Sequence, residues 1–417
     1  MIPVEEALQI ILDRFEPLEP EEVDILEGLG RVLAQDVYAA EDIPPFDNSA
    51  MDGYALRSAD TKGASKETPA RLRVVASLAA GHITATVVEP RMAIRIMTGA
   101  PLPAGADAVA RFEDSSESLT GTWERGEEVE IYTEVRPRQH VRPRGEDIRR
   151  GELVLPQGAL LRPQEIGVLA SLGRSRFLVV RRPRVAIVAT GDELLEINKD
   201  LGPGKIRSSN EYSIAALVEK YGGIPIRLGI ARDRVGELSA KVEEGLAAGV
   251  DLFLTCAGAS VGDYDVVKDV LGAEGEMRFW QVKMRPGKPL VFGEVRGVPF
   301  VGLPGNPVAA MVSFEQFVRP AMLKMLGSSR WGKPTVEVIL DHDIIVTGER
   351  RHYLRAIVES GDDGYHASVV RGPHGSGVLT SMVRANALLV VPEGVAQVGA
   401  GERLQAQMLD WPEEVAL

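Results

Sequence analysis

The stretch FVGLPGNPVAAM, residues 300–311, places two prolines and two glycines between an apolar run and the start of a helical pattern. The run before it is typical of a buried strand, and apolar side chains then recur at helical spacing, at Met311, Val312, Phe314, Phe317 and Val318. Asn306 suits an N-cap, Pro307 suits the first helical position, and Gly305 permits close approach to the main chain. The stretch therefore predicts either an anion cradle at a helix N-terminus or a simple strand-to-helix turn.

Strand and helix patterns alternate on both sides of this stretch. The order is RVAIVAT, SSNEYSIAALVEKYGG, IPIRLGI, RVGELSAKVEEGLAAG, DLFLTC, YDVVKDVL, PLVFGE and VPFVGL. Ser208 and Glu211 stand in capping-box register at the first helix. Apolar strands that alternate with helices predict a doubly wound, mostly parallel sheet over residues 176–329, with ligands bound beyond the carboxyl ends of its strands.

The flanking regions have other patterns. Apolar residues at helical spacing predict an N-terminal amphipathic helix, at Val4, Ala7, Leu8, Ile11 and Leu12. Short segments rich in valine and isoleucine predict a small β domain between about residue 70 and residue 135. Beyond Pro334, further short strand patterns predict a terminal β-barrel or β-sandwich. The fold class is thus α/β and multidomain, with β domains on either side of the central sheet.

Composition narrows the class of protein. A chain of 417 residues, 45% of them hydrophobic, predicts about three globular domains. No run of about 18 apolar residues occurs, and the N-terminal stretch is acidic, so we expect a soluble cytoplasmic protein without a membrane partner. The single cysteine, Cys256, excludes an internal disulfide, and the six histidines lack zinc-ligand spacing.

The formal net charge is −13, which argues against binding to nucleic acid or to an anionic membrane. An anionic ligand must therefore be held by a local cluster of cations. The first candidate cluster comprises Arg136, Arg138, His140, Arg142 and Arg144, which is more simply a solvated surface. The second comprises Lys283, Arg285 and Lys288, where the intervening Pro286 and Gly287 favour a shaped loop.

Polar and glycine residues follow three of the predicted strands. Thr190, Gly191, Asp192 and Glu193 end or follow the first; Gly258, Ser260, Gly262, Asp263 and Asp265 follow another; Pro304, Gly305, Asn306 and Pro307 follow the last. In a parallel sheet these loops converge on one crevice, where Arg285 and Lys288 would add positive charge. Carboxylates among phosphates repel unless a divalent cation intervenes, which indicates Mg²⁺. The alternative for each carboxylate, and the favoured one for Asp263 alone, is helix capping.

Seven motifs occur in the order seen in the molybdopterin molybdenumtransferases, the family of bacterial MoeA and the E domain of gephyrin. They are PPFDNSAMDGYA, RIMTGAPLPAGADAV, RPRGEDI, VATGDELLE, SVGDYD, PGKP and GLPGNPV. The resemblance implies an elongated subunit that forms a homodimer. It has an elongated dimerisation domain (1–45 with 141–175), a small β domain (46–140), a molybdopterin-binding α/β domain (176–329) and a C-terminal β domain (330–417).

The resemblance also implies the reaction and its residues. Molybdate or tungstate is inserted into adenylated molybdopterin, with Mg²⁺-dependent cleavage of the pyrophosphate and release of AMP. By matching motifs, the resemblance implies five catalytic carboxylates, which are Asp52, Asp147, Glu193, Asp233 and Asp265. Glu193 and Asp265 would be metal ligands, and Asp52 would act across the dimer. The glycine-rich loops bind the pterin substrate, through Thr190, Gly191, Asp192, Gly258, Ser260, Gly262, Asp263 and the 304–307 turn. The residues implied to bind the oxyanion are Arg285, Lys288, Arg350 and Ser376. Expected partners are the molybdopterin adenylyltransferase and acceptor molybdoenzymes.

Some residues depart from the family pattern. Ala257 stands where relatives commonly have glycine, Ala309 where they often have serine, and Arg285 where lysine is frequent. Two other classes of function therefore stay open. One is a scaffold that binds the pterin without transfer, and the other is a generic magnesium-dependent nucleotide hydrolase, although neither a Walker loop nor a GxGxxG motif is present.

Overall fold

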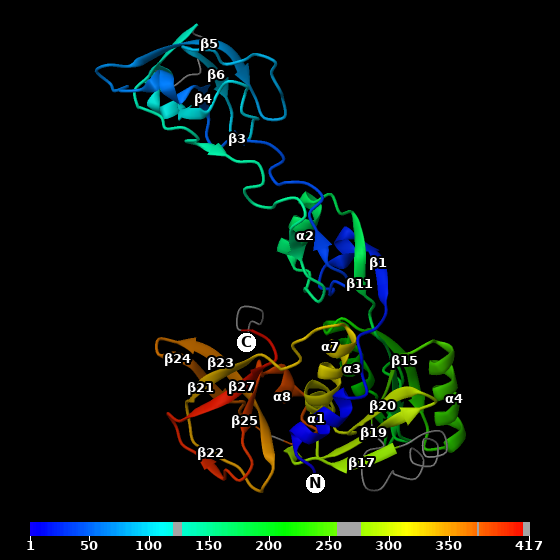
Figure 1. Ribbon diagram of the computed structural model, residues 1–417. Helices are drawn as coiled ribbons and strands as arrows, with labels where there is room; N and C mark the ends of the chain where they lie inside the picture. Colours follow the sequence, from blue (N-terminus) through cyan, green and yellow to red (C-terminus); the bar gives the residue numbers. More distant parts are fainter. Residues whose placement is uncertain (120–126, 257–276, 373–374, 412–417) are drawn as a thin grey trace. The chain divides into compact units, whose positions relative to one another are not determined.

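A computed structural model describes residues 1–119, 127–256, 277–372 and 375–411. The chain forms two compact units. The first contains residues 1–34, 158–162 and 176–417, and the second contains residues 35–157 and 163–175 (Figure 1). In the described part of the chain, no helix combines the length and apolar character needed to cross a bilayer.

The first unit is built on a six-stranded sheet in the order β15-β12-β16-β20-β19-β17. Its strands are β12 (Arg184–Thr190), β15 (Ile224–Ala231), β16 (Leu252–Cys256), β17 (Met277–Gln281), β19 (Pro289–Val295) and β20 (Val298–Leu303). Four neighbouring strands, from β15 to β20, are parallel, and β19 is antiparallel to both β20 and β17. These pairings confirm the predicted mostly parallel sheet. Its strands are apolar because the strands of a parallel sheet are buried on both faces.

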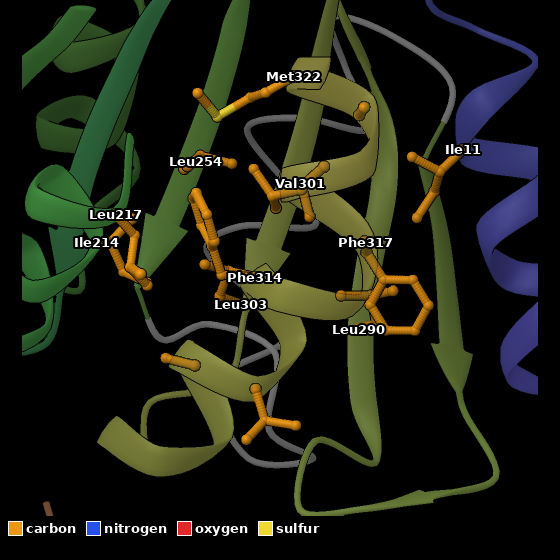
Figure 2. Close-up of a cluster of buried hydrophobic side chains, with 14 of the residues drawn as sticks. Ile11, Ile214, Leu217, Leu254, Leu290, Val301, Leu303, Phe314, Phe317 and Met322 are labelled. Carbon is orange, nitrogen blue, oxygen red and sulfur yellow. The ribbon is translucent and has the colours of Figure 1, made fainter. Parts of the chain in front are cut away.

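Helices cover both faces of this sheet. The first face carries α1 (Val4–Leu12), α3 (Asn210–Lys220) and a continuous helical segment formed by α6 (Pro307–Ser313), η5 (Phe314–Val318) and α7 (Arg319–Met325). The second face carries α4 (Val235–Ala247). In Figure 2, Phe314 and Phe317 of η5 pack over Val301, Leu303 and Leu290 of the sheet. The helix expected over YDVVKDVL lies outside the described residues.

The start of α3 differs from its prediction. Ser209, not Ser208, is the N-cap and makes no side-chain capping bond. Ser208 Oγ is buried without a hydrogen-bond partner, and Glu211 accepts a bond from Arg227 Nε of β15 at 3.0 Å. The capping-box prediction was wrong because Glu211, at 1% exposure, pairs with an arginine of the adjacent strand rather than with its own helix.

The C-terminal strands close into a barrel, because β25 pairs with β23. Of the two predicted architectures, the barrel is therefore confirmed and the sandwich is wrong. The barrel is formed by β21 (Thr335–Leu340), β23 (Arg351–Gly361), β24 (Gly364–Val369), β25 (Ala387–Val391) and β27 (Arg403–Met408). A two-residue strand, β18 (Met284–Arg285), pairs in parallel with β23. The rim carries β22 (Ile344–Ile345), which pairs with β26 (Gln397–Val398), and α8 (Thr380–Val383). The first unit is completed by η1 (Ile25–Gly28) and by β1 (Pro20–Asp24), which pairs with β11 (Arg176–Val180).

The second unit contains a five-stranded sheet in the order β7-β4-β6-β5-β8, which confirms the small β domain. Its strands are β4 (Gly53–Leu56), β5 (Ala70–Leu78), β6 (Met92–Ile96), β7 (Ala108–Arg111) and β8 (Glu128–Ile131). The short elements are β2 (Val37–Tyr38) with β10 (Leu153–Leu155), β3 (Asn48–Ser49) with β9 (Val141–Arg142), η2 (Ser58–Thr61), η3 (Phe112–Asp114), η4 (Ser116–Leu119) and α2 (Pro163–Ser171). Gly53 permits β4 to lie close to β7, because a Cβ at this position would lie 1.9 Å from the carbonyl oxygen of Ala110.

A buried ionic cluster lies between the helical segment and the barrel. Glu315 of η5, at 3% exposure, accepts hydrogen bonds from Lys333 Nζ at 2.7 Å and from Tyr221 Oη at 2.8 Å. Burial lowers the pKa of Lys333, and burial also raises the pKa of Tyr221. Removal of the carboxylate would therefore leave a buried ammonium group without its counter-charge.

We predict that Glu315→Gln lowers the free energy of unfolding by about 3 kcal/mol, the cost of a broken buried ion pair. The matched control is Glu337→Gln, in which the lost partner is the exposed Arg403, and this should cost less than about 0.5 kcal/mol. Urea unfolding of both variants tests the difference. Equal losses would show that the buried cluster adds no more than a surface pair.

Candidate functional site

Several strand ends of the central sheet lie at one edge, because β12, β15, β16 and β20 run parallel. Thr190 ends β12 and Gly191, Asp192 and Glu193 follow it; Asp233 follows β15; Pro304, Gly305, Asn306 and Pro307 follow β20. Two of the three loops predicted to converge are therefore at the same edge. The third carries Gly258, Ser260, Gly262, Asp263 and Asp265, which lie outside the described residues.

The loop after β12 is held against the end of β15. The main-chain N–H of Asp192 donates to Oδ2 of Asp233 at 3.3 Å, and the N–H of Asp233 donates to Oδ1 of Asp192 at 3.4 Å. Arg232 donates to the carbonyl oxygens of Leu194 and Asp192 at 2.8 and 3.0 Å. The loop after β12 and the segment after β15 therefore present exposed residues with carboxylates, Asp192, Glu193 and Asp233, at the same edge of the sheet.

A cavity of about 740 Å³ lies where the loop after β20 meets the barrel, which is the size of a small-molecule site. Seven of the predicted site residues line it: Arg285, Lys288, Pro304, Gly305, Asn306, Arg350 and Ser376. They come from the PGKP loop, the turn after β20 and the barrel. The structure therefore brings the predicted oxyanion residues and the LPGNP turn to one wall.

Two local features shape this wall. Gly287 has φ of +100°, and a Cβ there would lie 2.6 Å from Oγ of Ser313, so the PGKP loop needs glycine at this point. The carbonyl oxygen of Gly305 accepts a hydrogen bond from Asn210 Nδ2 at 2.6 Å, which ties the turn to α3. Asn306 is the N-cap of α6 and Pro307 begins the helix, although the Asn306 side chain makes no capping bond.

The cavity wall is strongly positive. Within the described residues, no carboxylate oxygen lies within 4.0 Å of the side-chain nitrogens of Arg285, Lys288 or Arg350. Arg355 adds a fourth cation, although burial lowers the pKa of its guanidinium. Among the described lining residues, Asp343 carries the one carboxylate, and its Oδ1 accepts a bond from Ala400 N at 2.8 Å. Four cations against one carboxylate suit a small polyanion.

Sequence reasoning missed two polar residues of the wall, Arg355 and His352. Both lie on β23, and Arg355 is 2% exposed, with Nε donating to Ser381 Oγ at 3.1 Å. The available signal was an arginine inside an apolar strand pattern, since a buried charge needs a structural or binding reason. Its placement at the cavity depends on how the barrel meets the sheet, which strand periodicity does not specify.

Asp52 and Asp147 belong to the second unit, and both are exposed. Asp52 precedes β4, and its Oδ1 accepts hydrogen bonds from the N–H and the Oγ1 of Thr98 at 2.7 and 2.8 Å. Asp147 follows β9, and its N–H donates to the carbonyl oxygen of Ile43 at 3.0 Å. Their predicted roles at the site of the first unit stay predictions.

Within the described ranges, no three histidine, cysteine, aspartate or glutamate side chains are arranged to hold a metal ion. The predicted pair of ligands was Glu193 with Asp265, and Asp265 is outside those ranges. The described arrangement offers a cationic cavity that suits a small anion, together with exposed carboxylates farther along the same sheet edge.

Family models match most of the chain. The MoeA N-terminal region (domain I and II) matches residues 2–173, a probable molybdopterin binding domain matches residues 186–324, and the MoeA C-terminal region (domain IV) matches residues 337–409.

The chain is also similar to named proteins along nearly its whole length. It is 36% identical to molybdopterin molybdenumtransferase 2 of Mycobacterium tuberculosis, over 97% of this chain and 99% of the relative. It is 36% identical to the molybdopterin molybdenumtransferase of a Nostoc species, over 92% and 87%. A crystal structure of the molybdopterin biosynthesis MoeA protein from Pyrococcus horikoshii superposes with a TM-score of 0.81 and 31% identity, covering 98% of this chain and all of that one.

We predict opposite effects from two charge changes in the cavity wall. Lys288→Ala should weaken binding of tungstate, a divalent tetrahedral oxyanion, by about tenfold, and Asp343→Asn should strengthen it by about threefold, because each changes the local potential by one charge. The asparagine keeps the oxygen that accepts from Ala400. Titration calorimetry with tungstate measures both, and an unchanged affinity in Lys288→Ala would remove that residue from the oxyanion site.

Proposed function

The chain belongs to the MoeA family of molybdopterin molybdenumtransferases, and we propose that it inserts molybdate or tungstate into adenylated molybdopterin. It is thus a transferase of molybdenum cofactor biosynthesis. In this proposal the pyrophosphate of the substrate is cleaved in a Mg²⁺-dependent step, and AMP leaves.

One observation carries the assignment of the oxyanion pocket: the cavity collects Arg285, Lys288, Arg350 and Arg355 against one described carboxylate. Such a wall holds a dianion by charge and by directed N–H donors. Gly305 and Asn306 line the same cavity, so the pterin phosphate would meet the turn after β20 beside the oxyanion. Positioned positive charge is also what cleavage of a phosphoanhydride mainly requires.

The proposed metal ligands are Glu193 and Asp265. Mg²⁺ in proteins often takes one or two carboxylates and completes its octahedron with substrate phosphates and water, so a cage of three side chains is not required. The exposed carboxylate of Glu193, on the loop after β12, would supply one such ligand. When bound, the ion would neutralise the pyrophosphate.

Further parts of the proposal come from the family resemblance. The protein acts in the cytoplasm as a homodimer, in which Asp52 reaches the site of the other subunit and Asp147 completes the set of carboxylates. It receives its substrate from the molybdopterin adenylyltransferase and passes the product to acceptor molybdoenzymes.

The deciding experiment is an assay of purified protein for AMP release from adenylated molybdopterin with and without molybdate. The proposal expects release that depends on both molybdate and Mg²⁺. Tight pterin binding without turnover would identify a scaffold, and turnover of ATP alone would identify a generic nucleotide hydrolase. Either result overturns the proposal.

We predict that Glu193→Ala abolishes molybdate-dependent AMP release and leaves the thermal unfolding temperature unchanged, because the side chain is exposed. Asp200→Ala, an exposed carboxylate of the following loop, is the matched control and should keep its activity. An active Glu193→Ala enzyme would exclude this residue as the metal ligand.

We predict that Asp52→Asn also abolishes turnover. Asparagine keeps an oxygen that can accept from Thr98, so the loop before β4 retains its hydrogen bonds while the charge is lost. The assay uses AMP release, with circular dichroism as the check of folding. Full activity in this variant would assign Asp52 to local structure instead of catalysis.

A further inference from the structure

His352 lies in the cavity wall, and none of the family motifs gives it a role. It lies on β23 directly opposite Arg285 in the β18–β23 ladder, so the two side chains share one face of the sheet. The imidazole is 4% exposed and lines the cavity together with Arg285 and Arg350. It is therefore a titratable group at the place proposed for the oxyanion.

The hydrogen bonds of His352 define its tautomer. Nε2 lies 3.1 Å from the carbonyl oxygen of Thr347, which can only accept, so Nε2 carries a hydrogen and donates. In the neutral ring, Nδ1 is then an acceptor. Among the described residues, no hydrogen-bond donor or acceptor partners Nδ1. The Oγ1 of Thr347 accepts from Arg285 Nη1 at 3.4 Å, which links the arginine and the imidazole through one residue.

The charges around His352 are almost all positive. Strand β18 contributes Arg285, the PGKP loop that follows it contributes Lys288, and β23 with its preceding loop contributes Arg350 and Arg355. The loop before β22 contributes Asp343, the one carboxylate of the described wall. Arg351 is paired with Glu5 and Glu393, while β25 places Val391 opposite His352.

Burial lowers the pKa of His352 below its ordinary value, and the positive charges of Arg285 and Arg350 lower it further, against the hydrogen bond to Thr347, which raises it. Without a bound anion the imidazole is accordingly neutral near pH 7. A bound dianion reverses the local potential and favours the imidazolium form.

We propose that His352 takes up a proton when the divalent oxyanion binds, so that Nδ1 becomes a donor to the oxyanion and binding is coupled to proton uptake. This rests on the proposed function, because it assumes that molybdate or tungstate occupies this cavity. The balance is one oxyanion and one proton bound per site, with no covalent step. His352 is thereby an affinity-determining residue of the oxyanion site.

The sign of the pH dependence follows from linkage. The bound state has the higher pKa for His352, so the bound state holds more protons between the two pKa values. Affinity therefore rises as pH falls through the bound-state pKa and levels off below the free-state pKa. The gain is at most about tenfold for each pH unit, the limit for one proton.

Titration calorimetry with tungstate alone tests the coupling without turnover. Titrations at about pH 5.5 to about pH 8.5, the range that brackets an imidazole, should be repeated in buffers of different ionisation enthalpy to count the protons taken up. The wild-type protein should take up a fraction of a proton, up to one, and should bind tungstate more tightly at lower pH. His352→Gln keeps an amide donor toward Thr347 but does not titrate, so its proton uptake should vanish and its affinity should be nearly independent of pH.

His342→Gln is the matched control, because His342 is exposed on the same domain and does not line this cavity. It should retain the proton uptake of the wild type. Equal proton uptake in His352→Gln and the wild type, or none in the wild type, overturns the role of His352 and leaves the oxyanion site intact. Absence of tungstate binding by the wild type at every pH would instead contradict the proposed function itself.

Discussion

The cavity depends on a ladder of two residue pairs. Strand β18 pairs with β23 of the barrel, with Met284 opposite Arg351 and Arg285 opposite His352. Arg285 leads directly into the PGKP loop, so this pairing fixes the start of the loop against the barrel. One wall is therefore assembled from segments more than sixty residues apart in sequence, and neither the sheet nor the barrel contains it alone.

Other contacts hold the sheet and the barrel in the arrangement that this ladder requires. The Glu315 cluster fixes Lys333, which precedes β21, and the neighbouring Gln316 donates to Gln407 of β27 at 2.7 Å. Lys220 at the end of α3 pairs with Asp410. Buried hydrogen-bonded charges tolerate little displacement, because each lost partner exposes an unpaired group to an apolar surrounding. The helical segment after the LPGNP turn thus serves as packing for the sheet and as the support of the barrel.

Much of the fold could be predicted from sequence because it depends on short-range patterns. Apolar runs such as RVAIVAT and DLFLTC became β12 and β16, and the turn residues after β20 lie at a strand end as expected. The predictions that failed, and the site residues that were missed, depend on tertiary packing. Glu211 fits a capping pattern, yet its carboxylate pairs with Arg227. Arg355 and His352 read as part of an ordinary barrel strand, and their place in the cavity wall depends on how the barrel meets the sheet.

The position of the cationic wall within an acidic protein affects how an anion is gathered. The molecule as a whole carries a charge of −13, which opposes the approach of a dianion from a distance. At physiological ionic strength this opposition is screened beyond about 8 Å, whereas the attraction inside a partly enclosed cavity is screened far less. A dianion would then be retained through its residence time in the cavity rather than through frequency of encounter.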